Sequence, residues 1–329
     1  MRRYLGRARG AAVVALALTA TACGGSSTPV PAPQASASPT GGSTASTALP
    51  LAGPVGLVEA ADGTVWAAWS GSDAIAPLDG DGAPGAPVEV GDTPLRIAEL
   101  DGSLWVTTIR DGTVHQVDPQ AGEVRRSVDL GGEPEGLTGL DGHLFVVLQA
   151  DAVLAELDPA DGSVVRRYPV GGEPRLVVPG HGVLFVGDFA GGRVVRVTPG
   201  QDQRPARSKP VCAGVQDLQL LGGSLWAACM TDGTLVALDP ETLRVRRTVP
   251  VEGDPDGLTP GSGADLLVSL QDGPGLAVLD TATGQVDRVF TGTSGRLYDQ
   301  ANNDVLERDG TAFLSDFSGN RVDIVRLPE

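Results

Sequence analysis

The chain has 329 residues, and 46 Gly and 25 Pro among them indicate that it changes direction often. Its 41 acidic residues outnumber its 24 basic residues and give a formal net charge of -17. This charge argues against non-specific nucleic-acid binding, which needs clustered Lys and Arg. The length allows one or two domains with a large core.

Residues 1–22 resemble a bacterial export signal, with Arg residues followed by an apolar run over residues 11–18. That run is far shorter than the ~20 apolar residues that a transmembrane helix needs. The segment Ala20-Thr21-Ala22-Cys23 resembles the lipobox of bacterial lipoproteins. This resemblance implies a diacylglycerol on Cys23 and an anchor on the extracytoplasmic side of the cell membrane. The alternative is an ordinary signal peptide that is cut nearby, with Cys23 incidental.

The segment over residues 23–46 follows as a polar stretch that consists almost entirely of Gly, Ser, Thr, Pro and Ala and carries no charge. Such a composition cannot bury enough apolar surface to fold. We expect a disordered tether with a coil reach of about 25 Å. The folded domain is expected over residues 47–329.

The domain repeats itself with a period near 40 residues. One apolar position recurs in seven units, as Trp66, Trp105, Phe145, Phe185, Trp226, Leu267 and Phe313. Each unit holds several short strand-like runs joined by Asp-Gly turns, which favour hairpins because Gly accepts positive φ. A period near 40 with such runs is typical of a propeller blade. The sequence predicts an all-β, seven-bladed β-propeller in which these recurring side chains pack between blades.

Two further features refine this prediction. The last unit ends without an outer strand, so we expect residues 47–51 to supply it and close the ring, which removes an exposed sheet edge. Trp69 lies outside the recurring position and is a weaker candidate for a contact at the rim.

The units resemble those of the YVTN and NHL β-propeller families and of streptogramin B lyase-like propellers. Gly-x-Pro-x-Gly-Leu openings, Asp-Gly-x-Leu-Trp-Val turns and Asp-Pro…Gly turns carry the resemblance over residues 47–329. These families include binders, sensors and a few enzymes, so the resemblance implies a fold and leaves the function open. Streptogramin B lyases use His and Glu at a catalytic centre, and His115, His143 and His181 do not reproduce that motif. We expect His115 in a third strand and His143 and His181 at hairpin turns, and we interpret the three as scattered surface or turn residues and not as a site.

Cys212 and Cys229 are the only thiols besides Cys23. The first is expected in the loop that leads into the fifth blade and the second at the end of that blade's second strand. Both places lie on one face of a propeller, and an exported chain meets an oxidising compartment. We expect a disulfide between them, and two buried free thiols are the alternative.

Two adjacent positions before each inner strand vary from unit to unit, and inner strands line the channel of a propeller. The charged residues at these positions are Arg96, Glu135, Arg175, Asp217, Asp256 and Asp304. We expect them to ring the channel mouth, where they could hold a cation or a ligand that carries both charges. The alternative is a solvated ring of paired charges, each pair worth about 0–1 kcal/mol.

The loop that leads into the seventh unit is longer than the period requires. It carries Arg296, Tyr298, Asp299, Asn302 and Asn303, which could form a lid over the ring. Long loops on a rigid scaffold often carry function, although a tolerated surface insertion is the alternative.

We therefore expect a monomeric, non-enzymatic binding module without a cofactor, whose partner is a protein, a peptide or a cell-envelope component. The alternative is a propeller enzyme of lactonase or lyase type. Gluconolactonase-like propellers hold a divalent metal, and Glu135, Asp217, Asp256, Asn303 and Asp304 offer oxygen ligands for Ca²⁺ or Mg²⁺. The neighbouring Arg96 and Arg175 disfavour a bound cation.

Overall fold

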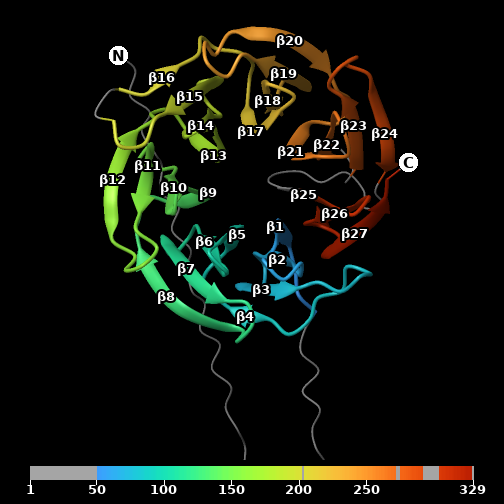
Figure 1. Ribbon diagram of the computed structural model, residues 1–329. Helices are drawn as coiled ribbons and strands as arrows, with labels where there is room; N and C mark the ends of the chain where they lie inside the picture. Colours follow the sequence, from blue (N-terminus) through green and yellow to red (C-terminus); the bar gives the residue numbers. More distant parts are fainter. Residues whose placement is uncertain (1–49, 202–203, 272–274, 292–303, 328–329) are drawn as a thin grey trace, which may run out of the picture. The chain divides into compact units, whose positions relative to one another are not determined.

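The computed structural model describes residues 50–201, 204–271, 275–291 and 304–327. Within these residues there is no helix, and the strands form seven small antiparallel sheets around a central channel (Figure 1). The predicted all-β, seven-bladed β-propeller is thereby confirmed. The signal, the tether and the expected lid over residues 292–303 lie outside the described residues.

The first four blades each have four strands. They comprise β1 (Pro54–Glu59), β2 (Val65–Trp69), β3 (Ala74–Pro77) and β4 (Val88–Glu89); β5 (Pro94–Leu100), β6 (Ser103–Thr108), β7 (Thr113–Asp118) and β8 (Glu123–Asp129); β9 (Pro134–Leu140), β10 (His143–Leu148), β11 (Val153–Leu157) and β12 (Val164–Pro169); and β13 (Pro174–Gly180), β14 (Val183–Asp188), β15 (Arg193–Val197) and β16 (Ala206–Arg207).

The last three blades follow the same order. They comprise β17 (Val215–Leu221), β18 (Ser224–Cys229), β19 (Thr234–Leu238) and β20 (Val245–Pro250); β21 (Pro255–Pro260), β22 (Asp265–Leu270), β23 (Gly275–Asp280) and β24 (Val286–Thr291); and β25 (Val305–Arg308), β26 (Thr311–Asp316) and β27 (Arg321–Arg326). Strands pair in chain order, so each blade is a simple meander from the channel outward.

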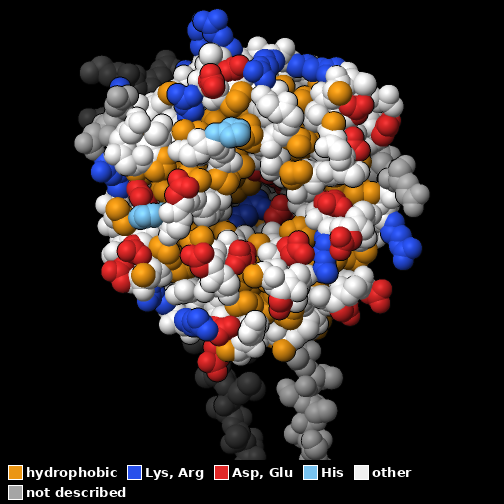
Figure 2. Space-filling view, viewed as in Figure 1, with side chains coloured by type: hydrophobic (Ala, Val, Ile, Leu, Met, Phe, Trp, Pro, Cys, Tyr) orange, Lys and Arg blue, Asp and Glu red, His pale blue; other side chains and the backbone are white. Residues whose placement is uncertain are grey.

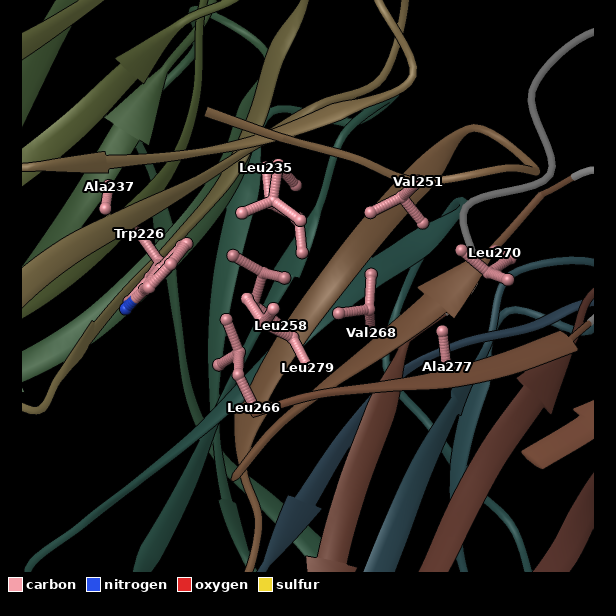
Figure 3. Packing of buried hydrophobic residues seen from close by; sticks show 12 residues of the cluster. Trp226, Leu235, Ala237, Val251, Leu258, Leu266, Val268, Leu270, Ala277 and Leu279 are labelled. Atoms are coloured by element: carbon pink, nitrogen blue, oxygen red, sulfur yellow. The ribbon is translucent and has the colours of Figure 1, made fainter. Parts of the chain in front are cut away.

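The core lies between neighbouring blades. In one such layer Trp226 and Leu235 of blade 5 pack with Leu258 and Val268 of blade 6 (Figure 3). The side chains at the recurring position are all buried, at 7 % exposure or less, which confirms their predicted packing role. Trp69 is only 1 % exposed and packs in a cluster with Phe313 of blade 7, so the expectation of a rim contact is wrong.

Blades 7 and 1 are joined by side-chain contacts. Arg308 donates from Nη1 to the carbonyl of Gly63 and lies 3.5 Å, Nε to Oε1, from Glu59. The amide of Gly53 donates to Asn320 Oδ1 at 2.9 Å. The seventh sheet has three strands in the part of the chain that is described, where Pro50 and Leu51 form no strand. A closing strand over residues 47–51 therefore stays a prediction.

A disulfide joins Cys212, in the loop before β17, to Cys229 at the end of β18, with Cα atoms 5.9 Å apart. It ties the start of blade 5 to that blade's second strand. The described residues include no helix that is long and apolar enough to cross a membrane.

Candidate functional site

The inner strands of blades 1 to 6 begin with the same irregularity. In blade 2, Pro94 pairs with Thr108 and Arg96 pairs with Thr107, so β5 carries one extra residue, Leu95, in a β-bulge. The same register shift occurs near the start of β1, β9, β13, β17 and β21. A bulge re-aims side chains locally. In blades 1 to 6 this bulge coincides with the two variable positions of the repeat, whereas the pairing of β25 with β26 in blade 7 has no register shift.

Arg96, Asp217 and Asp304 come together at the centre of the ring. They line a cavity of about 100 Å³ whose remaining walls are Ile97, Gly136, Leu137, Leu176 and Val177. Figure 2 shows basic and acidic side chains inside the central hollow. The three charged residues occupy the second variable position of blades 2, 5 and 7.

Arg96 is buried and ion-paired within the cavity wall. Its Nη1 lies 3.3 Å from Asp304 Oδ2, and its Nε and Nη2 are buried without a hydrogen-bond partner among the described residues. Burial works to lower the pKa of Arg96, but the carboxylates of Asp304, Asp256, Glu135 and Asp217 outweigh it and raise the pKa. The guanidinium thus stays charged in a mainly acidic surrounding.

The two aspartates connect neighbouring inner strands. Asp217 accepts the amide of Leu218 at 2.7 Å and, across to blade 6, the amide of Leu258 at 2.8 Å. Asp304 similarly accepts the amides of Val305, at 3.0 Å, and of Leu57 in blade 1, at 2.9 Å. Burial raises the pKa of Asp217 to about 7, and the negative charge of Asp304 adds to this rise. The backbone hydrogen bonds and the positive charge of Arg96 lower the pKa but do not outweigh the rise.

Glu135, Arg175 and Asp256 form a second set, at the first variable position. Glu135 and Asp256 are fully buried and accept hydrogen bonds from Gln149 and Gln271, at 3.1 and 2.8 Å. Burial raises the pKa of Glu135 against the opposing charges of Arg175 and Arg96. The expected single ring of six charges is thus two sets, of which only Arg96, Asp217 and Asp304 line the cavity.

Arg175 joins the second set from blade 4. Its Nη1 lies 3.6 Å from Glu135 Oε2, its Nη2 lies 2.6 Å from Glu173 Oε1, and its guanidinium lies 4.9 Å from the centre of the Phe189 ring. Gln149, Phe189 and Gln271 were missed by the sequence reasoning. Each directly follows a second strand, and this shared repeat position was the signal that could have found them.

None of the histidines lines the channel cavity. His115 lies in β7, the third strand of blade 2, as expected, but it is buried and hydrogen-bonded to Ser127 Oγ and Thr108 Oγ1, at 2.9 and 3.1 Å. Burial lowers its pKa despite the nearby Asp111. His143 Nδ1 lies 3.2 Å from Glu156 Oε1, and His181 occupies the turn between β13 and β14.

Across the described residues, no three His, Cys, Asp or Glu side chains are grouped so that they could hold a metal ion. Glu135, Asp217, Asp256 and Asp304 instead accept hydrogen bonds from amide groups of the protein. Asn303 and the other expected lid residues, Arg296, Tyr298, Asp299 and Asn302, lie outside the described residues.

The fold resembles several solved propellers. A catalytically inactive His-to-Ala variant of virginiamycin B lyase from Staphylococcus aureus, with quinupristin, superposes with a TM-score of 0.74 at 15% identity over 84% of this chain and 96% of that one. A streptogramin B lyase superposes with a TM-score of 0.72 at 16% identity over 85% of this chain and 95% of that one. Hydrazine synthase from Kuenenia stuttgartiensis superposes with a TM-score of 0.68 at 15% identity over 87% of this chain and 99% of that one.

No protein-family model matches the chain, and the search of curated proteins found no significant match. At such low identity the structural likenesses report on the fold alone. The chain therefore has a streptogramin B lyase-like, seven-bladed β-propeller fold.

Proposed function

We propose that this chain is a membrane-anchored extracytoplasmic lipoprotein whose propeller is a non-enzymatic module that binds a ligand at the channel mouth. The observation that carries the proposal is the buried guanidinium of Arg96, a residue that lines the cavity and has two donors without an acceptor among the described residues. Buried polar groups are otherwise almost always hydrogen-bonded, so unpaired donors beside a cavity favour a bound ligand. The ligand would be a small molecule or an exposed group of a peptide, protein or envelope component.

The anchoring part of the proposal rests on the sequence Ala20-Thr21-Ala22-Cys23. In cells that process lipoproteins, we expect the wild-type chain in the membrane fraction and the Cys23→Ser variant in the soluble fraction. Mass spectrometry of the mature N-terminus should show a diacylglycerol on Cys23. A wild-type chain that is cleaved elsewhere and lacks lipid would overturn the anchor.

The binding part can be tested by chemical analysis of the purified full chain. Leu176 lines the cavity, so Leu176→Phe should fill it without removing a charge. Small molecules extracted from the wild-type protein should be absent from this variant and retained by Val165→Phe, a control on the exposed outer strand β12. Equal retention by all three proteins, or no ligand in any of them, would contradict a channel ligand.

A lactonase- or lyase-type enzyme with a divalent metal is the competing function. The hydrogen bonds that Asp217 and Asp304 accept in the cavity wall and the proximity of Arg96 favour the non-enzymatic proposal. Metal analysis of the full chain, together with its melting temperature in Ca²⁺ and in Mg²⁺, distinguishes the binding module from the metal-dependent enzyme. A stoichiometric ion that raises the melting temperature would overturn the non-enzymatic proposal.

A further inference from the structure

The two donors of Arg96 that have no acceptor among the described residues lie on one edge of its guanidinium. Nη1 is engaged by Asp304 Oδ2 at 3.3 Å, which leaves Nε and Nη2. In a guanidinium group, Nε–H and the neighbouring Nη2–H run parallel and form a planar fork. Two parallel N–H groups match the two oxygens of a carboxylate, which is the usual bidentate partner of Arg.

The neighbouring acids of the protein accept hydrogen bonds from other donors, although Glu135 Oε1 is buried without a hydrogen-bond partner among the described residues. Asp304 accepts the amides of Val305 and Leu57, and Asp217 accepts those of Leu218 and Leu258. Glu135 and Asp256 accept the side-chain amides of Gln149 and Gln271, respectively. These contacts fix the acids at the start of their own strands, and none of them supplies an acceptor for the fork of Arg96 among the described residues.

The cavity beside Arg96 is small and mixed in character. It holds about 100 Å³, and Ile97, Leu137, Leu176 and Val177 supply apolar walls. Since each water in the liquid takes about 30 Å³, this is room for about three waters. A carboxylate with a short alkyl stub fits both the volume and the apolar walls.

We propose that the channel cavity binds a carboxylate group, with its two oxygens accepting hydrogen bonds from Nε and Nη2 of Arg96 and its short alkyl portion against Leu137 and Leu176. The inference rests on the proposed function and names the ligand class for the same site. The carboxylate belongs either to a small free monocarboxylate or to the C-terminus of a peptide, and both present the same group to the fork.

The charges around the cavity make this binding depend on pH. Arg96 faces Asp217, Asp256, Asp304 and Glu135, and Arg175 lies beside Glu135. Burial raises the pKa of Asp217 to about 7. Protonation of Asp217 below this value removes a negative charge from the cavity wall, so a carboxylate should bind more tightly at pH 6 than at pH 8.

The test is isothermal titration calorimetry on the full chain with acetate and propionate as probes. Acetamide is the neutral control and methylammonium the cationic control. We expect both carboxylates to bind, at least fivefold more tightly at pH 6 than at pH 8, and neither control to bind. Trialanine with a free C-terminus, compared with its C-terminal amide, distinguishes a peptide source from a small free acid.

Variants of Arg96 show whether acetate binding needs the planar pair of donors or only a positive charge. Arg96→Lys keeps the charge but loses the planar fork, so we expect at least tenfold weaker acetate binding. Arg125→Lys, on the exposed outer strand β8, is the matched control and should bind like the wild type. Asp217→Asn should bind acetate more tightly than the wild type at pH 8 and lose most of the pH dependence. Unfolding curves at each pH confirm that every variant is folded.

Three results would overturn the inference: acetamide binding as tightly as acetate, unchanged acetate binding by Arg96→Lys, or no carboxylate binding by the folded wild type. If Arg96→Lys does not fold, Leu176→Phe takes its place and should abolish acetate binding. The wild type could instead yield an extracted ligand that lacks a carboxylate and that Leu176→Phe does not retain. The proposed function would then stand, and this inference would fail. If the wild type neither yields an extracted ligand nor binds a carboxylate, the proposed function and this inference are both rejected.

Discussion

Arg96 of blade 2 pairs with Asp304 of blade 7 across the intervening blade 1, with Nη1 and Oδ2 3.3 Å apart. Blade 1 has a glycine, Gly56, at the equivalent position, where a Cβ would lie 2.9 Å from Arg96 Cα and 2.5 Å from the Leu95 carbonyl. The inner strands of blades 1 and 2 therefore approach closely. The ion pair, with the hydrogen bond from Leu57 to Asp304, connects three blades at the point where the ring closes.

Removal of the Asp304 carboxylate should destabilise the ring. Asp304→Ala leaves the buried Arg96 guanidinium without its ion-pair partner and the Leu57 amide without its acceptor. Loss of one partner from a largely buried pair costs about 3 kcal/mol. Urea unfolding followed by fluorescence of the buried Trp residues measures the free energy of unfolding. Asp81→Ala, at an exposed turn, is the control and should differ from wild type by less than about 0.5 kcal/mol. Equal midpoints for the two variants would contradict the role of the pair.

The raised pKa of Asp217 predicts how stability changes with pH. The folded-state pKa is about 7, above the ordinary value of about 3.9 in the unfolded chain. Between these values the folded protein binds the proton more tightly, so this group's contribution to stability falls as pH rises from about 4 to about 7. The Asp217→Asn variant lacks this ionisable group, so this loss of stability with rising pH is absent from it.

The comparison requires urea unfolding of wild type and Asp217→Asn at pH 5 and pH 8. The stability of the variant relative to wild type should be greater at pH 8 than at pH 5. Other carboxyl groups cancel in this difference, since both proteins carry them. A difference that does not change between the two pH values would refute the assignment of a raised pKa to Asp217.

Gly136 should tolerate no side chain because two inner strands meet there. A Cβ at this position would lie 2.7 Å from both the Arg175 carbonyl and Leu176 Cα in blade 4. Gly136→Ala should lower the free energy of unfolding by about 1–3 kcal/mol, the usual cost of overpacking. Gly80→Ala is a suitable control because nothing lies within 4 Å of its Cβ position. Similar stability of the two variants would argue against the close approach of blades 3 and 4.

The disulfide between Cys212 and Cys229 should stabilise blade 5. The cysteines are separated by 17 residues, and closure of a loop of this length is worth roughly 3 kcal/mol. In a Cys23→Ser background, thiol titration of the denatured chain should show no free thiol before reduction and two after it. The further change of both remaining cysteines to Ser should lower the melting temperature. Two titratable thiols before reduction would exclude the bond.

The number of blades could be predicted from local signals alone. Hairpin turns and the recurring position that holds Trp105 and Phe145 depend on residues close together in the chain, so the repeat is visible in the sequence. The burial of Trp69 could not be predicted in the same way. Its partner Phe313 comes from the last blade, and only ring closure brings the two into one cluster.

The candidate site was predicted in part. Repeat variation identified the charged residues at the starts of the inner strands, because variable positions on a repeated scaffold are visible by alignment of the units. The division into two sets was not visible. It depends on which inner-strand side chains line the cavity, and Arg96, Asp217 and Asp304 come from three different blades. Only closure of the ring brings these three blades around one cavity, so the repeat alone does not reveal it.

The sequence by itself determined the all-β class, the period and the seven blades, since these follow from turn chemistry and short-range alternation. Only the tertiary structure decided which charges meet. Arg96 and Asp304 lie far apart in the chain, and their pairing depends on closure of the ring and on the absence of a side chain at Gly56. The folded surroundings of Asp217 likewise raise its pKa to about 7, because burial removes water that would otherwise stabilise its charge.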